Sequence, residues 1–241
     1  MFTILFYFWL RRKGIIMKAL VLFSGGLDST TCLALACEKY GSENVIALSI
    51  SYGQKHNKEI EAARGIAQYF RCVHKELDLK KIFEDSSCTL LEGRGDIPHE
   101  DYKSQLEKEA TVSTYVPFRN GLFLSSAASI ALANDCEVIY YGAHADDAAL
   151  NAYPDTSVDF NDAINKAIYI GSGNKLKVVG PFISFSKAMV VKEGMRLHVP
   201  FGLTWSCYEG HDKACGVCAT CRDRIRAFKE NGIEDPIEYE E

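Results

Sequence analysis

Apolar runs of strand length alternate with longer segments of helical character between residues 18 and 199. The apolar runs predict five strands, at 18–23, 44–52, 72–79, 137–144 and 175–182. Apolar residues at helical spacing predict five helices, at 28–41, 57–70, 118–135, 157–173 and 186–199. This alternation favours an α/β fold, with a doubly wound, mostly parallel sheet covered on both faces by right-handed crossovers.

Polar clusters follow three of the predicted strands directly. SGGLDST follows the first strand, YGQKH the second and GAHADD the fourth. Ligands of such sheets bind at the carboxyl ends of the strands, so these clusters predict one binding edge. Residues 84–115 form a long polar excursion, which is typical of a lid or binding segment but equally of a plain surface loop.

The turn after the first predicted strand has the composition of a phosphate-binding loop. Glycines allow the backbone to approach a ligand closely, and the free N–H groups at a helix start attract anions. Backbone N–H groups of residues 25–29 are expected to hold phosphate oxygens, with hydroxyl donors from Ser24, Ser29 and Thr30. The loop is neither a Walker motif nor a dinucleotide fingerprint. The plain alternative is a glycine turn that only starts a helix.

Four of the nine cysteines lie close together near the carboxyl terminus, at Cys207, Cys215, Cys218 and Cys221. Two-residue gaps are typical of a tetrahedral zinc site, and four thiolates leave no open position, so a structural Zn²⁺ is expected. Iron–sulfur ligation and metal-free packing remain the alternatives. The other five cysteines share no ligand spacing and are expected mostly in the core.

Length and charge limit the organisation of the chain and its partners. A chain of 241 residues can form one full core, and a net charge of −5 provides no basic field for gripping long nucleic acid. Residues 1–16 are too short to span a bilayer and place their basic residues after the apolar run, so a dispensable extension before Met17 is expected. We expect an ATP-binding α/β domain at 17–204, a zinc segment continuous with it at 205–228, and a tail at 229–241.

Two resemblances refine this interpretation. The Ser-Gly-Gly-x-Asp-Ser turn resembles the pyrophosphatase-type loop of the adenine-nucleotide α-hydrolase fold, which implies cleavage of ATP between its α and β phosphates. Residues 18–228 resemble the 7-cyano-7-deazaguanine synthase family of queuosine biosynthesis. The resemblance rests on eight motifs in this order: FSGGLDSTTCL, YGQKH, VPFRN, GAHADD, YPD, SKA, TWSCY and CGVCATCRDR. Lys55 and Thr156 depart from this pattern, where relatives commonly have Arg and Cys.

The family resemblance implies a reaction and its participants. An ATP-dependent ligase of this kind converts 7-carboxy-7-deazaguanine and ammonia into the nitrile, using Mg²⁺–ATP, in the cytoplasm. No nucleic-acid or membrane partner is expected, and a homodimer is left open.

The resemblance and the loop chemistry together suggest roles for individual residues. Catalytic roles are expected for Ser24, Asp28, Ser29 and Lys187, with Asp28 meeting Mg²⁺ and Lys187 meeting phosphate charge. ATP contacts are expected from Phe23, Ser24, Gly25, Gly26, Leu27, Asp28, Ser29, Thr30, Thr31, Cys32 and Leu33. Substrate contacts are expected from Gln54, Arg119, Asn120, Asp147, Tyr153 and Asp155. Each of these substrate residues could instead be an ordinary helix-start or loop residue, and Lys187 could be a solvated charge at a helix start.

Two rival functions share some of these features. A tRNA-thiolating ATPase has the same type of loop, but it needs an RNA-gripping appendage and usually a reactive cysteine or an iron–sulfur centre. A nucleotide-binding zinc protein without catalysis would show no ATP–pyrophosphate exchange stimulated by the carboxylate substrate.

Overall fold

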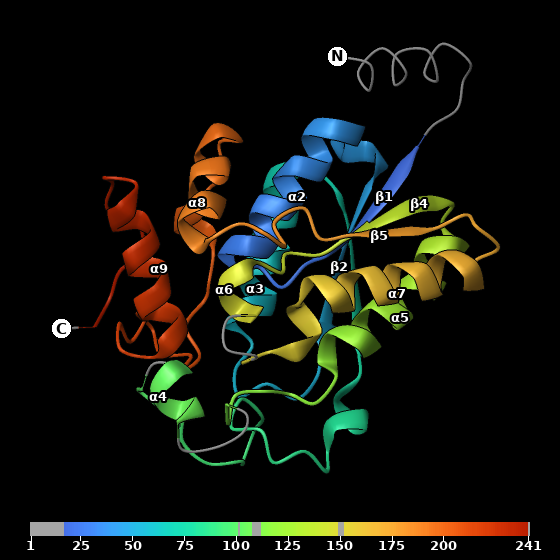
Figure 1. Cartoon of the computed structure of the whole chain (residues 1–241). Coiled ribbons are helices and arrows are strands. Elements are labelled where there is room, and N and C mark those ends of the chain that lie inside the picture. The colour runs from blue at the N-terminus through green and yellow to red at the C-terminus, as the bar shows by residue number, and fades with distance from the viewer. Residues whose placement is uncertain (1–16, 101, 108–111, 149–151, 241) are drawn as a thin grey trace.

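Five parallel strands form one sheet in the order β3-β2-β1-β4-β5 (Figure 1). The computed structural model describes residues 17–100, 102–107, 112–148 and 152–240. The strands span Lys18–Leu22 (β1), Val45–Ser51 (β2), Val73–Asp78 (β3), Cys136–Tyr140 (β4) and Lys177–Val179 (β5). All four strand pairings are parallel, so the predicted sheet is confirmed.

The five predicted helices are present and cover both faces of the sheet. They span Leu27–Tyr40 (α2), Lys58–Phe70 (α3), Arg119–Ala133 (α5), Val158–Gly171 (α7) and Lys187–Arg196 (α8). Short helices and 3-10 turns lie between them, at Ser42–Asn44 (η1), Lys80–Phe83 (η2), Tyr102–Leu106 (α4), Ala145–Ala148 (α6), Pro154–Thr156 (η4) and Phe201–Leu203 (η5).

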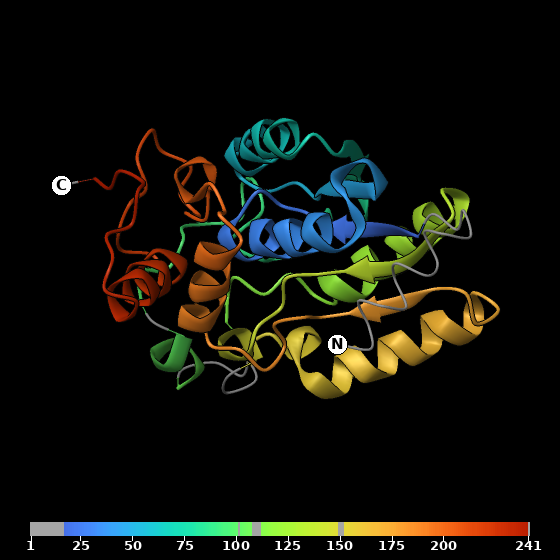
Figure 2. The same cartoon turned by 90° about the horizontal axis from the view of Figure 1, so that it is seen from above.

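Alternating side chains of the central strands build two separate apolar layers. Ala19 and Val21 of β1 pack with α2, α3 and α8, whereas Leu20 packs with α5 and α7. Figure 2 shows α2 and α3 (blue to teal) on one side of the strands and α7 (yellow to orange) on the other. A strand buried on both faces has to be apolar throughout, which is why β1 and β2 are continuous apolar runs.

A further helix, α9 (Ala219–Glu230), lies beside α8 and was not predicted from the apolar pattern (Figure 1). The buried face of α9 consists of Ala219, Cys221, Arg224, Ala227 and Phe228. Only one of these five side chains is a large apolar group, so the helical spacing gives a weak hydrophobic signal.

Arg224 of α9 is fully buried and ties down the chain that follows the helix. Its guanidinium donates to both carboxylate oxygens of Asp235, at 2.6 and 2.9 Å. It also donates to the Thr204 hydroxyl at 2.7 Å, and the Tyr239 hydroxyl donates to Asp235 at 2.7 Å. Ala214 and Tyr239 form a parallel bridge. The segment predicted as a tail therefore packs against the cysteine segment over its described residues.

Residues 84–115 were predicted as either a lid or a surface loop, and their described part packs onto the turn after β2. The backbone N–H of Lys55 donates to the Leu90 carbonyl, and that of Glu92 to the Gly53 carbonyl. Cys88, Leu90 and Leu91 are buried in the same apolar cluster as Tyr52. Within the described ranges, every helix is too short or too polar to cross a membrane.

Removing the buried Arg224 charge should destabilise the protein far more than removing an exposed one. Arg224→Met leaves the Asp235 carboxylate buried and without its cation, which costs about 3–5 kcal/mol of unfolding free energy. The control is Arg196→Met, because the Arg196–Glu38 pair is half exposed and such pairs contribute roughly 0–1 kcal/mol. Urea denaturation measures both values, and equal losses would contradict the assigned role of Arg224.

Candidate active site and metal centre

A pocket of roughly 230 Å³ opens at the carboxyl ends of β1, β2 and β4. Its walls come from the turn after β1, the turn after β2 with the start of α3, the start of α5, and the turn after β4. Residues 205–208 and the first turns of α9 complete it. The three polar clusters of the sequence thus meet at one edge, as expected for a parallel sheet.

Gly25 allows the first turn to pack directly against α3. Its φ of +83° is in the left-handed region, and a Cβ there would lie 2.5 Å from the Glu59 carbonyl oxygen and 2.6 Å from the Ala63 nitrogen. Gly26 precedes α2 and has more room, because its added Cβ would meet Ser24 Oγ and the Trp205 carbonyl oxygen at 3.3 Å. Packing therefore requires the first glycine, whereas the need for the second as a place of ligand approach stays a prediction.

The hydroxyls of the turn divide into two groups. Ser24 and Ser29 line the pocket and hydrogen bond to each other at 3.1 Å. Thr30 and Thr31 are fully buried and donate to the carbonyls of Gly26 and Leu27, at 2.7 and 2.9 Å. The Ser29 hydroxyl also donates to the Gly26 carbonyl, at 3.1 Å, so what separates the two groups is position: Ser24 and Ser29 border the pocket, whereas Thr30 and Thr31 do not.

The predicted ATP contacts fall in two places. The residues that line the pocket are Phe23, Ser24, Gly26, Asp28 and Ser29. The residues that do not are Gly25, Leu27, Thr30, Thr31, Cys32 and Leu33, which are buried in the turn and in α2. Their contribution to ATP binding stays a prediction.

Lys187 and Asp28 form an ion pair at one end of the pocket. Lys187 is only 6% exposed, and its Nζ donates to Asp28 Oδ2. Nε2 of His144 lies 3.3 Å from Lys187 Nζ and 3.7 Å from Asp28 Oδ1. Burial raises the pKa of the Asp28 carboxyl, but Lys187 and His144 outweigh it, so the pKa lies below its usual value.

The carboxylate of Asp28 still has one oxygen available. Its Oδ1 is buried and accepts no hydrogen bond within the described structure. A buried carboxylate oxygen without a donor fits a hard cation, so Asp28 suits the Mg²⁺ that accompanies ATP.

Arg119 and Tyr52 form another wall. The Arg119 guanidinium lies 5.4 Å from the centre of the Tyr52 ring and donates to its hydroxyl at 3.4 Å. Burial lowers the pKa of Arg119, but Tyr52 and Asp155 favour the charged form more strongly, so the pKa is raised and the cation persists. A fixed cation beside an aromatic ring can hold the carboxylate of a planar ligand.

The other predicted substrate residues lie near Arg119. Gln54 and Tyr153 line the pocket, and the backbone N–H of Asn120 donates to Asp155 Oδ2 at 2.8 Å. Burial raises the pKa of Asp155 although this bond opposes it. The Tyr153 hydroxyl hydrogen bonds to Thr114 at 2.7 Å. The side chain of Asp147 lies outside the described residues.

Glu59 in the first turn of α3 also lines the pocket, and the sequence motifs did not single it out. Burial raises the pKa of its carboxyl to about 7, although Arg119 opposes this shift. Trp205, Tyr208 and Asp223 were missed as well. The sequence signal for Glu59 was weak: it lies in the first helical turn after YGQKH. An acid at a helix start is ordinarily explained by the helix dipole, so the sequence alone does not mark it as a pocket residue.

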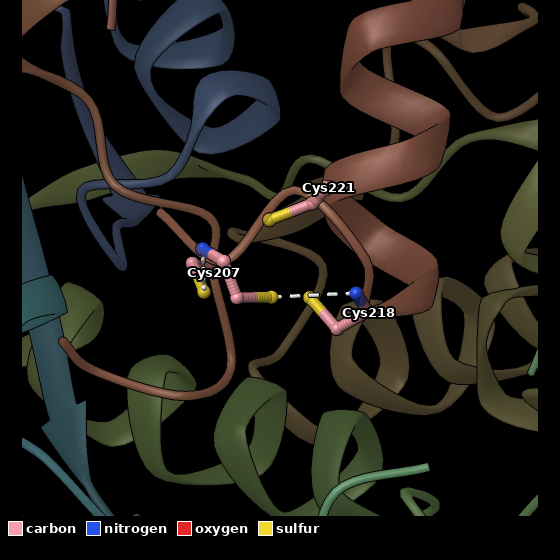
Figure 3. Close-up of side chains that lie close together, drawn as sticks. Cys207, Cys218 and Cys221 are labelled. Carbon is pink, nitrogen blue, oxygen red and sulfur yellow. Dashed lines mark hydrogen bonds between the residues drawn. The ribbon is translucent and has the colours of Figure 1, made fainter. Parts of the chain in front are cut away.

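The four clustered cysteines form a buried group that could hold a metal ion. The sulfurs of Cys207, Cys215, Cys218 and Cys221 all lie within 4.8 Å of one another. Figure 3 shows the side chains of Cys207, Cys218 and Cys221 turned toward a common centre. Hydrogen bonds from the Cys218 and Cys221 thiols, and from backbone N–H groups, lower the pKa of the Cys207 thiol. A preformed set of four sulfurs fits a tetrahedral ion.

The cysteine group is joined to the phosphate loop through Trp205. The Trp205 backbone N–H donates to the Gly25 carbonyl at 3.0 Å, and its indole N–H donates to the Cys207 carbonyl at 2.9 Å. His56, which the sequence left unassigned, lies 3.1 Å from the same carbonyl. Order in the cysteine segment therefore affects the wall of the pocket.

Comparison with known proteins identifies the family. The model of the family described as queuosine biosynthesis protein QueC matches residues 18–232. The chain belongs to this family. Proteins named 7-cyano-7-deazaguanine synthase from Acetivibrio thermocellus and Pseudoalteromonas atlantica are 42% and 39% identical to it, over 93% of this chain and 98% and 100% of theirs.

A solved structure places the QueC family chain in a wider fold class. The U34-tRNA thiolase NcsA from Methanococcus maripaludis, with its [4Fe-4S] cluster, superposes with a TM-score of 0.52 at 16% identity. The match covers 90% of this chain and 67% of the thiolase. A likeness at this identity shows a common fold, and function has to be argued from the site.

The raised pKa of Glu59 should make its contribution to stability depend on pH. The folded protein holds the Glu59 proton up to a pH of about 7, above the value of 4.5 for an ordinary Glu, so this group lowers stability as pH rises from 4.5 toward 7. In Glu59→Gln this loss is absent. The Tm of Glu59→Gln minus the Tm of the parent protein should therefore be larger at about pH 8 than at about pH 5.

Melting curves at both pH values test this, with Glu61→Gln as the control because Glu61 is exposed on the same helix. A Tm difference for Glu59→Gln that does not change with pH would contradict the perturbed carboxyl.

Proposed function

We propose that this protein is an ATP-dependent enzyme that converts 7-carboxy-7-deazaguanine and ammonia into 7-cyano-7-deazaguanine. The observation that carries the proposal is one pocket, in a chain of the QueC family, shared by the phosphate loop, the Asp28–Lys187 pair and the Arg119 cation. A ligase of this kind has to hold a triphosphate and a carboxylate side by side, and this pocket offers groups for both.

The reaction follows from the leaving groups. A carboxylate cannot lose oxide, so its oxygen first attacks the α-phosphorus of ATP and pyrophosphate leaves. Ammonia then forms a C–N bond at the acyl carbon while the C–O bond to AMP breaks, and the amide results. A second adenylation on the amide oxygen gives an imidate, which loses a proton from nitrogen and AMP to form the nitrile. No nucleophilic side chain is required, so catalysis rests on positioning and charge.

The phosphate end of the pocket supplies donors and cations. Backbone N–H groups at the start of α2 and the hydroxyls of Ser24 and Ser29 hold pyrophosphate oxygens, and Lys187 compensates their charge. Asp28 is the residue that would hold Mg²⁺, because one of its oxygens is free of hydrogen bonds. When bound, Mg²⁺ neutralises phosphate charge and orients the triphosphate.

The Arg119 end receives the deazaguanine ring. The guanidinium pairs with the carboxylate that is to be adenylated, and Tyr52 and Phe123 provide apolar faces beside it. Asp155 fixes the first turn of α5 by accepting the Asn120 backbone N–H, which keeps Arg119 aimed at the pocket. Gln54 and Tyr153 line this part of the pocket and contribute polar contacts to the ring edge, and a contact from Asp147 stays a prediction.

Zn²⁺ is the ion proposed for the four cysteines, and its role is structural. Four thiolates fill a tetrahedral shell and leave no position for a substrate. The small-molecule substrates and the net charge of −5 favour a cytoplasmic enzyme that does not grip RNA. The thiolase alternative is less favoured for the same reason, and a homodimer is compatible with this proposal.

One zinc ion per chain should be found in the purified protein. Cys215→Ser should lose most of the metal, because three thiolates bind it less tightly, whereas Cys136→Ser, which changes a buried core thiol, should keep it. Zinc sites of this kind contribute about 10–16 kcal/mol, so chelation should also unfold the segment around Trp205, seen as a change in its fluorescence. Iron in place of zinc, or full metal in Cys215→Ser, would contradict the assignment.

Each nitrile formed should consume two ATP and release two AMP and two pyrophosphate, because both C–O bonds of the carboxylate are broken through adenylation. The amide should accumulate when ATP is limiting. Mass spectrometry of AMP, amide and nitrile in one reaction measures the ratio. A ratio of one AMP per nitrile, or ADP as the main product, would rule out this mechanism.

A pair of glycine variants tests whether one site performs both adenylations. Gly26→Ala narrows the phosphate loop and should slow amide and nitrile formation by the same factor. Gly65→Ala in α3 is the matched control, since its added methyl meets nothing within 4 Å. Loss of only one of the two steps in Gly26→Ala would indicate two separate sites.

A further inference from the structure

The acidic side chains that line the pocket differ in whether they have an ion-pair or hydrogen-bond partner. Asp28 pairs with Lys187, and Asp223 lies 2.9 Å from Arg226. Asp155, just behind the wall, accepts the Asn120 backbone N–H. Within the described ranges, no hydrogen bond or ion pair holds the Glu59 carboxylate, and Arg119 acts on it only through its charge. Glu59 is therefore an acceptor in the pocket wall without a structural task of its own.

The backbone holds Glu59 at a fixed place beside the phosphate loop. Its carbonyl oxygen packs so closely on Gly25 that a Cβ there would lie 2.5 Å away. A substrate carboxylate that attacks ATP has to lie next to this loop, so the attached ring has to lie among the residues around Glu59 and Arg119.

The groups around Glu59 are mainly donors. Arg119 is a cation, and the Gln54 amide oxygen already accepts the Tyr52 backbone N–H at 2.9 Å, which leaves the Gln54 NH2 group as a donor. These donors suit the carboxylate and the ring carbonyl of the substrate. The same ring also carries a ring N–H and an exocyclic amino group, and these two donors require an acceptor in the wall.

We propose that the Glu59 carboxylate accepts hydrogen bonds from the ring N–H and the exocyclic amino group of the deazaguanine, and so selects 2-amino-oxopyrimidine rings. This inference rests on the proposed function and adds the specificity-determining residue. Glu59 is half-buried, and a ring bound against it takes its remaining water away, which costs free energy unless the ring supplies donors to the carboxylate. A ring without the amino group leaves the carboxylate poorly satisfied and is rejected.

The experiment compares two substrates in two variants. The substrates are 7-carboxy-7-deazaguanine and the analogue with hydrogen in place of the 2-amino group, and the variants are Glu59→Gln and the exposed control Glu61→Gln. The parent protein and Glu61→Gln should prefer the amino substrate in kcat/KM by at least about tenfold. In Glu59→Gln the value for the amino substrate should fall about 10- to 100-fold, with little change for the analogue, so that the preference disappears.

Other outcomes overturn the inference. An equal fall for both substrates in a Glu59→Gln protein that still unfolds cooperatively would show that Glu59 acts as a base or positions other groups, and an unchanged preference would show that another residue reads the ring. Calorimetric titration of both acids separates this inference from the proposed function. If the parent protein binds 7-carboxy-7-deazaguanine more tightly than the analogue without the 2-amino group but makes no nitrile, the proposed function fails and the Glu59 contact stands. If Glu59→Gln keeps the binding preference, the Glu59 contact fails.

Discussion

The buried pair of Lys187 and Asp28 is the interaction on which the geometry of the site depends. It joins the start of α2 to the start of α8 across 159 residues of sequence, with His144 from the turn after β4 beside it. Removing two charges from water costs more than their attraction returns unless further groups satisfy them, so such a pair is a poor device for stability alone. What the pair does provide is a cation and a carboxylate oxygen without a hydrogen bond at the lining of the pocket, and these are the groups that our proposal assigns to the triphosphate.

The cysteine group extends this constraint to the carboxyl-terminal end of the chain. The Trp205 backbone N–H donates to the Gly25 carbonyl and its indole N–H donates to the Cys207 carbonyl, so one residue links the turn after β1 to the cysteine group. Arg224 then ties α9 to Asp235. A metal held by these cysteines would order a segment that is part of the pocket wall, so a structural ion would also support the shape of the pocket.

The sequence was sufficient to predict the sheet and the binding edge, because both depend on regular patterns. Strands β1 and β2 are apolar on both faces, and polar turns follow them directly. Helix α9 was missed because its buried face contains Arg224 and Cys221, whose burial depends on partners outside the helix that the helical spacing does not reveal. Glu59 was missed for a related reason, since an acid in a first helical turn looks ordinary until α3 is seen to pack on Gly25.

The fold fixes one part of the pocket wall and leaves another part free to vary. The positions of the loop after β1 and of the strand ends are set by the sheet, which is the level at which the likeness to the thiolase NcsA holds. The ring-binding wall comes from the starts of α3 and α5 and from residues 205–208, which contribute side chains without altering the sheet. Side chains at the starts of α3 and α5, such as Glu59 and Arg119, can therefore be exchanged without altering the strand ends, which is why this part of the wall is where our proposals place substrate choice.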